Sequence, residues 1–242
     1  MKTYLSWPKQ TSILSLTLLL NIFSVWPSNN VLAENKYENN RQGWPSRRIS
    51  GGSRRCGVEN TDHNQLQQCL PLIALVSEGL AQTTQTLPSL WFYLPPIPNS
   101  DQIVLEFVLR DQEDQLVYEA TFKPTHQGEM TSFQLTQSQT FKGLVEGKAY
   151  HWYLSVIHKA QDRSHDDVVE GWLQRVPLNP SVAQQLKQAT PIEKVRIYQQ
   201  AELWPEAIAT MASLKQIQPN DPIIGQKWQQ LLTALELSLP TY

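Results

Sequence analysis

The sequence lacks any large excess of charge of one sign. Its 242 residues carry 20 Lys and Arg against 22 Asp and Glu, a formal net charge of -2. Such a chain has no global field to gather a polyanion, so we expect no nucleic-acid partner and no general attraction to anionic membranes. With 40% hydrophobic and 17% charged residues, the composition is that of a globular protein able to bury a core.

The short motifs that usually carry chemistry are also missing. The sequence contains no Gly-x-Ser-x-Gly elbow, no phosphate-binding glycine loop and no His-Glu-x-x-His helix. We therefore predict a protein that is not an enzyme, with no catalytic residue, no cofactor and no dedicated metal site.

Long apolar runs are absent except at the N-terminus. Lys2 and Lys9 precede an apolar stretch over residues 13–25, and small residues follow up to Ala33. This order is typical of a secretory signal, and polar residues keep the run shorter than the roughly 20 residues of a bilayer span. We expect residues 1–33 to be a signal peptide cleaved after Ala33. The mature protein would then be periplasmic or extracellular, with no transmembrane anchor.

Cysteine is scarce, and both cysteines, Cys56 and Cys69, follow the expected signal peptide. An oxidising compartment permits a disulfide between them, and closing a loop of this size contributes about 3 kcal/mol in the chain-entropy estimate. Free thiols or a redox pair are the alternatives, although redox chemistry needs an activating base or a Cys-x-x-Cys spacing. The disulfide is the favoured interpretation.

Residues 34–55 are polar and rich in arginine. No acidic residue interrupts the cluster Arg41, Arg47, Arg48, Arg54 and Arg55. The composition predicts a flexible basic linker. The alternative is that the arginines bind phosphate, lipopolysaccharide-like anions or an acidic partner, because the guanidinium fork suits bidentate anion contacts.

Residues 56–177 carry the β-strand signals. In one run Ile103, Leu105, Phe107 and Leu109 alternate on one face, which is typical of a strand with one buried face. Seven such runs predict two antiparallel sheets packed face to face in a β-sandwich. The runs are Leu72–Val76, Leu90–Leu94, Ile103–Arg110, Leu116–Phe122, Met130–Leu135, Tyr150–Ile157 and Val168–Val176.

The segment from Leu144 to Tyr150 resembles the tyrosine corner of fibronectin type III and immunoglobulin-like domains. The resemblance implies that the Tyr150 phenol hydrogen-bonds to upstream backbone. Trp152, Leu154 and Val156 continue the apolar face of Tyr150, so we expect this run to be the central core strand. The predicted fold is mainly β plus α: an immunoglobulin or fibronectin III-like sandwich followed by helices.

Residues 178–242 switch to helical signals. Three capping side chains precede a proline, at Asn179-Pro180, Thr190-Pro191 and Asp221-Pro222. Thr190 with Glu193 makes a capping box, which predicts a helix through Gln200, and a further helix is expected from about Pro205.

The two middle helices resemble a single tetratricopeptide repeat. Tyr198, Ala207 and Pro219 fall at the offsets at which that motif places its aromatic, small and closing proline residues. A single repeat cannot bury its own face, so the last helix, with Trp228, is expected to cover it. We interpret the segment as a helical appendage packed against the sandwich; a peptide-binding groove is the alternative.

Two further groups of residues invite a binding hypothesis. A loop contains His158, Asp162, His165, Asp166 and Asp167, which could hold zinc or another divalent ion. Its spacing matches no dedicated ligand motif, so a solvated loop is favoured. The run Trp91-Phe92-Tyr93 could offer a stacking platform for a glycan, but core packing is favoured because consecutive strand residues point to opposite faces.

Several segments between Arg47 and Leu235 together resemble the cyanobacterial domain of unknown function 928. The resemblance implies an exported cyanobacterial protein of unknown activity, and it supplies no catalytic residue. The segments are residues 47–54, 72–76 and 88–95, Glu170-Gly171-Trp172-Leu173-Gln174-Arg175-Val176, and Trp204-Pro205-Glu206-Ala207.

Two functional classes remain open from the sequence. A protein-interaction or scaffold module of the cell envelope, with an unidentified protein partner, is favoured because the predicted parts are binding folds. A sandwich that binds carbohydrate or another small ligand, with metal in the loop from His158 to Asp167, is the alternative.

Overall fold

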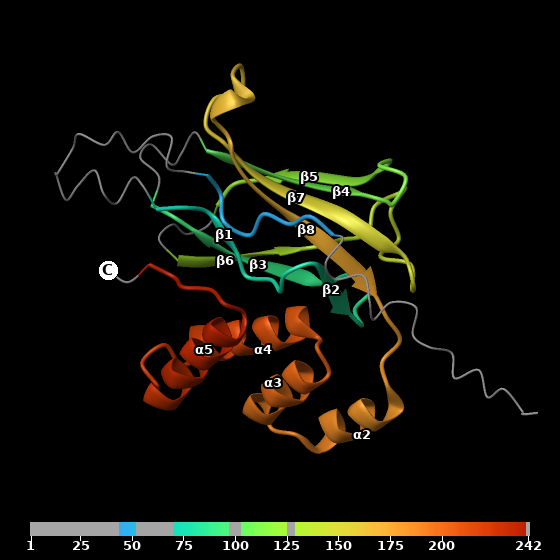
Figure 1. Cartoon of the computed structure of the whole chain (residues 1–242), viewed down its shortest axis with the longest axis vertical. Coiled ribbons are helices and arrows are strands. Elements are labelled where there is room, and N and C mark those ends of the chain that lie inside the picture. Colours follow the sequence, from blue (N-terminus) through green and yellow to red (C-terminus); the bar gives the residue numbers. More distant parts are fainter. Residues whose placement is uncertain (1–43, 52–69, 97–102, 125–128, 241–242) are drawn as a thin grey trace, which may run out of the picture. The chain divides into compact units, whose positions relative to one another are not determined.

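A computed structural model describes residues 44–51, 70–96, 103–124 and 129–240 (Figure 1). All of them belong to the compact unit Tyr37–Tyr242. The expected signal peptide with its cleavage site at Ala33, and both cysteines, Cys56 and Cys69, lie outside the described residues. Among the described helices, none has the length and apolar character needed to cross a membrane.

The larger of two sheets has five strands, in the order β5-β4-β7-β8-β2. The four strands from β5 to β8 pair antiparallel, but β2 joins β8 in parallel, with Leu80 opposite Trp172. The prediction of purely antiparallel sheets is therefore wrong at this edge, where a four-residue strand is too short to show alternation. The strands are β5 (Leu116–Phe122), β4 (Val104–Arg110), β7 (Ala149–Ile157), β8 (Asp167–Arg175) and β2 (Leu80–Thr83).

The smaller sheet has three antiparallel strands, in the order β1-β3-β6. They are β1 (Ile73–Ala74), β3 (Ser89–Leu94) and β6 (Glu129–Gln134). Each lies within or beside a run predicted from the sequence. Together with β4, β5, β7 and β8 of the larger sheet, they account for all seven predicted strands.

Large side chains from both sheets form one buried cluster. Trp152 of β7 is fully buried, as the sequence predicted for this strand. Its ring meets Phe92 of β3 edge-on at 5.8 Å between centroids and lies parallel to Phe107 of β4 at 6.5 Å. Gly171 of β8 is the residue opposite Trp152, and the indole lies over the place where a side chain would start.

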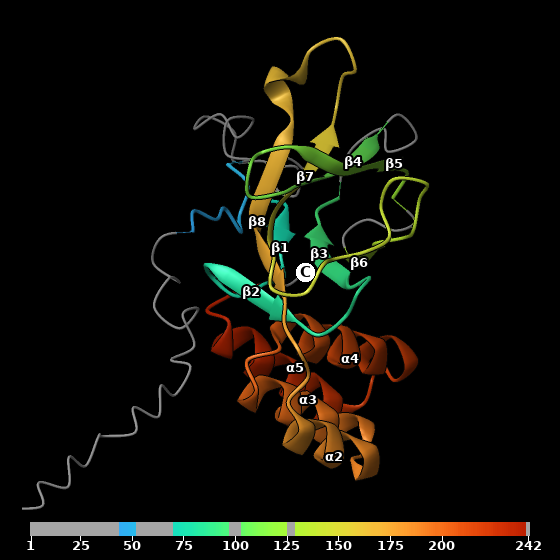
Figure 2. The same cartoon turned by 90° about the vertical axis from the view of Figure 1, so that its right-hand side faces the viewer.

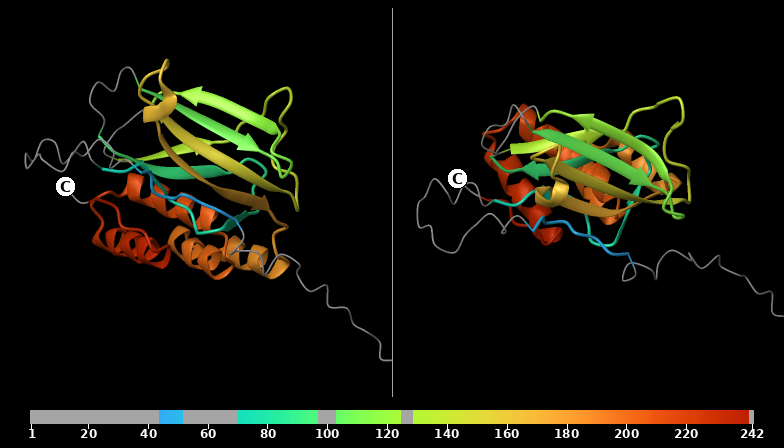
Figure 3. Two further views of the ribbon diagram at one scale, coloured as in Figure 1. Left: turned by 45° about the horizontal axis from the view of Figure 1, so that its top comes forward. Right: turned by 90° about the horizontal axis from the view of Figure 1, so that it is seen from above.

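Four helices form a layer against the other face of the small sheet, so that sheet lies in the middle (Figure 3). Trp91 and Tyr93 of β3 share a buried cluster with Met211 and Trp228 from two of the helices. All the expected helices are present, and the expected capping box of Thr190 and Glu193 is formed. The helices are α2 (Pro180–Gln188), α3 (Pro191–Gln200), α4 (Trp204–Ile217) and α5 (Pro222–Ala234).

Residues 44–51 link the two sheets along one edge. Arg47 pairs with Glu170 of β8 through two backbone hydrogen bonds of 3.0 Å, and Ile49 bridges to Ile73 of β1. The sequence predicted a solvated linker over 34–55; in its described part the chain is instead bonded to both sheets. Backbone groups of this segment replace water with strand partners, a pattern that composition does not reveal.

The hydrogen bond expected of Tyr150 is formed. Its phenol oxygen accepts from the backbone N–H of Val145 at 3.1 Å, while the ring is buried between the sheets. This bond satisfies the polar end of a core residue and fixes the turn that leads into β7.

Candidate functional site

A groove of about 330 Å³ lies where the chain between β2 and β3 meets α3 and α4. Figure 2 shows β2 next to the helical layer. The lining combines polar uncharged side chains with a few apolar ones and a single carboxyl group. The lining residues are Thr83, Gln85, Leu87, Pro88, Ser89, Gln134, Tyr198, Pro205, Glu206, Ala209 and Thr210.

Glu206 is the residue with a formal charge among the described residues that line this groove, and it is 6% exposed. Its Oε1 accepts hydrogen bonds from the Thr83 hydroxyl at 3.0 Å, the Thr84 backbone N–H at 2.6 Å and the Thr84 hydroxyl at 2.9 Å. Its Oε2 is buried and has no hydrogen-bond partner. The carboxyl group thus ties the end of β2 to α4 and keeps one acceptor unused.

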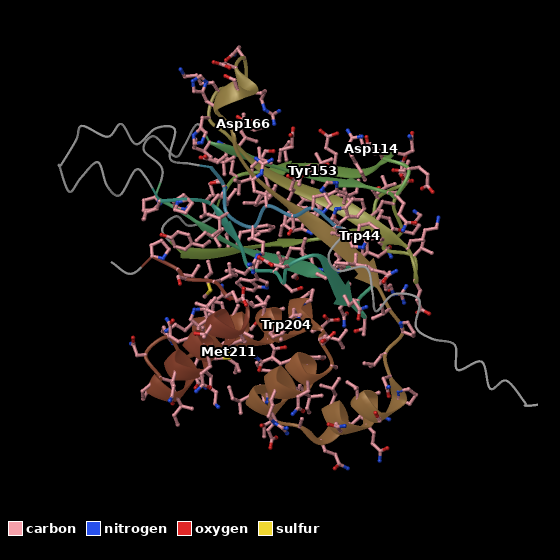
Figure 4. The ribbon with its side chains drawn as sticks, in the orientation of Figure 1. Trp44, Asp114, Tyr153, Asp166, Trp204 and Met211 are labelled. Atoms are coloured by element: carbon pink, nitrogen blue, oxygen red, sulfur yellow. The ribbon has the colours of Figure 1, made fainter. Side chains whose placement is uncertain are left out.

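The first turn of α4 places Glu206 at this position. Trp204 and Pro205 begin the helix, and proline suits its first turn because the N–H that it lacks would have no partner there. Figure 4 shows Trp204 and Met211 on this helix, and Met211 is fully buried in the cluster shared with β3. Packing along α4 therefore holds the Glu206 backbone rigidly against the sheet.

Burial is the main influence on the two titratable groups of the groove. Loss of water contact raises the pKa of Glu206, and the hydrogen bonds from Thr84 and Thr83 offset part of that rise. Burial likewise raises the pKa of Tyr198, and the negative charge of Glu206 raises it further. Burial in the groove therefore favours the protonated form of Glu206 relative to a carboxyl group in water.

The described lining of the groove offers a ligand one carboxyl group together with hydroxyl and amide groups. No second carboxyl, imidazole or thiol occurs among the described residues that line it. A lone carboxyl with a spare acceptor offers a ligand one charge-assisted hydrogen bond.

The loop proposed from sequence as a metal site joins β7 to β8 and contains a short 3-10 helix, η5 (Arg163–His165). Figure 4 shows Asp166 near the tip of this hairpin. Its side chains pair with one another: His158 Nε2 lies 2.9 Å from Asp167 Oδ2, and His165 Nδ1 lies 3.0 Å from Asp162 Oδ2.

Arg163 completes this pairing. Its guanidinium forms ion pairs with Asp166 and, at 2.7 Å, with Glu106 of β4. These two carboxylates raise the pKa of Arg163. Within the parts of the chain that the structure describes, no three His, Cys, Asp or Glu side chains are placed to hold a metal ion.

The run Trp91-Phe92-Tyr93 is buried on both sides. Phe92 faces the larger sheet, and Trp91 and Tyr93 face the helices. Core packing is thereby confirmed, and the glycan platform is wrong because the helical layer covers the face on which the sugar would stack.

The described arginines of the N-terminal cluster bind acidic groups of the chain itself. Arg47 forms an ion pair with Glu170 at 3.0 Å, and Arg48 forms one with Glu78 at 2.7 Å. Arg48 also donates to the Leu235 carbonyl at 2.5 Å, just beyond α5. These two guanidinium groups therefore fasten the edge segment to the fold.

A stack of rings lies on the outer face of the larger sheet. Trp44 meets Trp172 edge-on at 4.4 Å, and His151 lies parallel to Trp172 at 4.3 Å and next to Tyr153. Figure 4 labels Trp44 and Tyr153, the first and last rings of this series. Burial lowers the pKa of His151, although the nearby Glu170 carboxylate opposes that effect. The stack fixes residue 44 to β8.

Sequence reasoning did not single out Glu206 or its groove. In the sequence Tyr198 stands at the aromatic position of the tetratricopeptide-like motif, and Glu206 lies within the segment Trp204-Pro205-Glu206-Ala207 that carries the family resemblance. The signal present was a carboxyl in the first turn of a predicted helix whose neighbours are apolar. That position is common for acidic residues at helix starts, so it does not by itself indicate a site.

The family resemblance noted in the sequence is supported by a comparison with models of protein families. A search of curated proteins gives no match. Among protein families, DUF928, Domain of Unknown Function, matches residues 49–240. This range runs from the edge segment beside β1 to the chain beyond α5 and includes every residue of the Glu206 groove. The chain therefore belongs to the DUF928 family.

Proposed function

We propose that this protein is a binding module that holds part of a partner protein in the Glu206 groove. The observation that carries the proposal is the unused acceptor, Glu206 Oε2, on a buried carboxyl group that lines a groove. Leaving a buried acceptor without a partner costs about 1–3 kcal/mol, and a bound ligand with a donor would recover that free energy. The groove provides a site for the protein-interaction role expected from the sequence.

The setting of this role is part of the same proposal. The apolar stretch over residues 13–25 after Lys2 and Lys9 supports export to the periplasm or cell exterior. In an oxidising compartment, a disulfide between Cys56 and Cys69 would restrain the chain that leads into β1.

The proposal is also supported by likenesses between parts of this chain and folds that often bind other molecules. The bond between Tyr150 and Val145 supports an immunoglobulin or fibronectin III-like sandwich, and the hairpin of α3 and α4 supports a tetratricopeptide-like pair. Both folds are commonly used for binding, and the groove lies where the chain after β2 meets α3 and α4. This part of the proposal is an analogy between folds.

Selection from a displayed peptide library tests the proposal. The purified protein is expected to enrich related peptides, and Gln85→Trp is expected to lose them because an indole at this exposed lining position fills the groove. Gln229→Trp, which places the same side chain on the exposed face of α5, is the matched control and should retain them. Peptides that bind all three proteins equally would show that the groove is not the binding site.

A further inference from the structure

We infer that the Glu206 groove takes a primary ammonium group, supplied by a lysine side chain of the partner. This inference rests on the proposed function and names the chemistry of the segment that is bound. It depends on the charge of the groove, on the number of free acceptor sites at Glu206 and on the aromatic and apolar residues beside it.

The groove carries one negative charge without a balancing positive one. Glu206 is the only residue with a formal charge at neutral pH among the described lining residues, which include no Lys, Arg or His. A buried carboxylate is stable only when it is paired and hydrogen-bonded. A partner that brings a cation or a neutral donor would satisfy the second oxygen, and a cation gains more from the ionised carboxylate.

The hydrogen bonds already made by Glu206 favour ammonium over guanidinium. Its Oε1 accepts three bonds, from Thr83 and Thr84, whereas Oε2 accepts none. Arginine binds a carboxylate best with two parallel bonds, one to each oxygen, and the crowded Oε1 prevents this. An ammonium group is a compact donor that needs only the single free oxygen.

The remaining lining suits the rest of a lysine side chain. Tyr198 offers an aromatic ring, and rings of this kind attract a cation placed over their face. Leu87, Pro205 and Ala209 offer apolar surface for the methylene chain. Because Oε2 is enclosed, entry of the ammonium requires a lining side chain to move aside.

The pH dependence of binding follows from the titratable groups that face the ligand. These are Glu206 on α4 and Tyr198 on α3; the described lining from β2, β3, β6 and the connecting chain contributes none. Only the ionised carboxyl binds an ammonium ion strongly. The affinity for the lysine side chain should therefore rise with pH as Glu206 loses its proton. It should fall again only at the higher pH at which lysine or Tyr198 loses its proton.

The experiment compares three acetylated and amidated peptides of the form Ala-Xaa-Ala, in which Xaa is lysine, acetyl-lysine or arginine, and adds butylamine. Binding is measured by calorimetry and by amide chemical shifts of the full protein. The lysine peptide is expected to bind at least about tenfold more tightly than the acetyl-lysine peptide, which lacks the charge-assisted bond. The arginine peptide should lie between them.

Two results would overturn the inference. Equal affinity for lysine and acetyl-lysine would show that no ammonium is recognised, and butylamine binding as tightly as the lysine peptide would point to a free amine in place of a protein segment. If the lysine and acetyl-lysine peptides bind equally but Gln85→Trp still abolishes peptide capture, then the proposed function stands and only the inference of a bound ammonium group is wrong.

Two variants of the protein test the inference independently of the changes made to the peptides. Glu206→Gln keeps the acceptor that Thr83 and Thr84 use and removes the charge, so it should lose the preference for lysine. If this variant does not fold, Tyr198→Leu, which removes the aromatic face, should weaken lysine binding about threefold or more. A Tyr198→Leu protein with unchanged lysine affinity would contradict the proposed contact.

Discussion

Gly171→Ala should destabilise the protein, because the missing side chain of this glycine makes room for the ring of Trp152. A Cβ added at residue 171 would lie 2.7 Å from Cζ2, 3.1 Å from Cε2 and 3.3 Å from Nε1 of that indole. The ring has little room to retreat, since it is fully buried with Phe92 and Phe107 beside it.

The expected cost follows from the general behaviour of overpacked cores. Adding one methyl group to a well-packed interior costs about 1–3 kcal/mol. In a chain of this size that corresponds to a fall of roughly 2–10 °C in melting temperature. Gly225→Ala is the matched control: a Cβ there has nothing within 4 Å, and alanine in the interior of α5 should add about 0.5–1 kcal/mol.

Chemical denaturation of the two alanine variants and the parent measures both changes as free energies of unfolding. A third protein, Trp152→Phe, removes the indole atoms nearest residue 171, and a double-mutant cycle with Gly171→Ala should show that the two changes cost less together than separately. If Gly171→Ala unfolds at the same denaturant concentration as the parent, then the indole is not confined as the packing indicates.

Three further results are expected. Burial lowers the pKa of His151 from 6.5, so the unfolded chain binds this proton first and the His151 contribution to stability is lost as pH falls below about 6.5; unfolding of His151→Gln should lack this part of the pH dependence, and parallel curves would contradict it. The raised pKa of Glu206 acts in the opposite direction, because the contribution of Glu206 to stability is complete below its unfolded pKa near 4.5 and is lost as pH rises. The Glu206→Gln protein should therefore gain stability relative to the parent between pH 4 and 7. A difference in unfolding free energy between the two proteins that stays constant over this range would refute the raised pKa. Asp221→Ala removes the side chain that accepts from the N–H groups of Ile223 at 2.7 Å and Ile224 at 3.2 Å, and thermal unfolding should show a loss of about 1 kcal/mol; Asp221→Asn, which can still cap, should lose much less.

Local patterns in the sequence predicted most of the elements. Alternation at Leu105, Phe107 and Leu109 identified β4 because one of its faces meets the other sheet and the opposite face is partly exposed. The helix starts were predicted because Thr190 and Asp221 satisfy backbone N–H groups within a few residues of themselves. Interactions this short in sequence are visible without knowledge of the fold.

The layer order was not visible in the same way. The run Trp91-Phe92-Tyr93 is continuously apolar because β3 is buried on both faces, a property usually associated with parallel sheets. The sequence pattern predicts that all three residues pack in the core, but it does not indicate that they divide between two separate cores. The distinction depends on helices that follow about a hundred residues later.

The candidate site was missed for a related reason. Thr83 and Glu206 are 123 positions apart, and their contact exists only when α4 packs beside β2. Neither residue type is unusual where it occurs. Long-range contacts of this kind are fixed by tertiary packing, and a single sequence holds no local trace of them.

The position of the small sheet between two cores affects the order in which its two faces are covered as the chain folds. Strands β1 and β3 leave the ribosome long before α4 and α5, which cover their outer face. Until the helices are in place, the apolar side chains of Ile73, Leu75 and Trp91 on that face are exposed to water, and uncovered apolar strands are prone to aggregate. A chain that ended near Pro177 would leave this face of the small sheet uncovered. The C-terminal helices therefore complete the burial of the small sheet and protect it from association through that face.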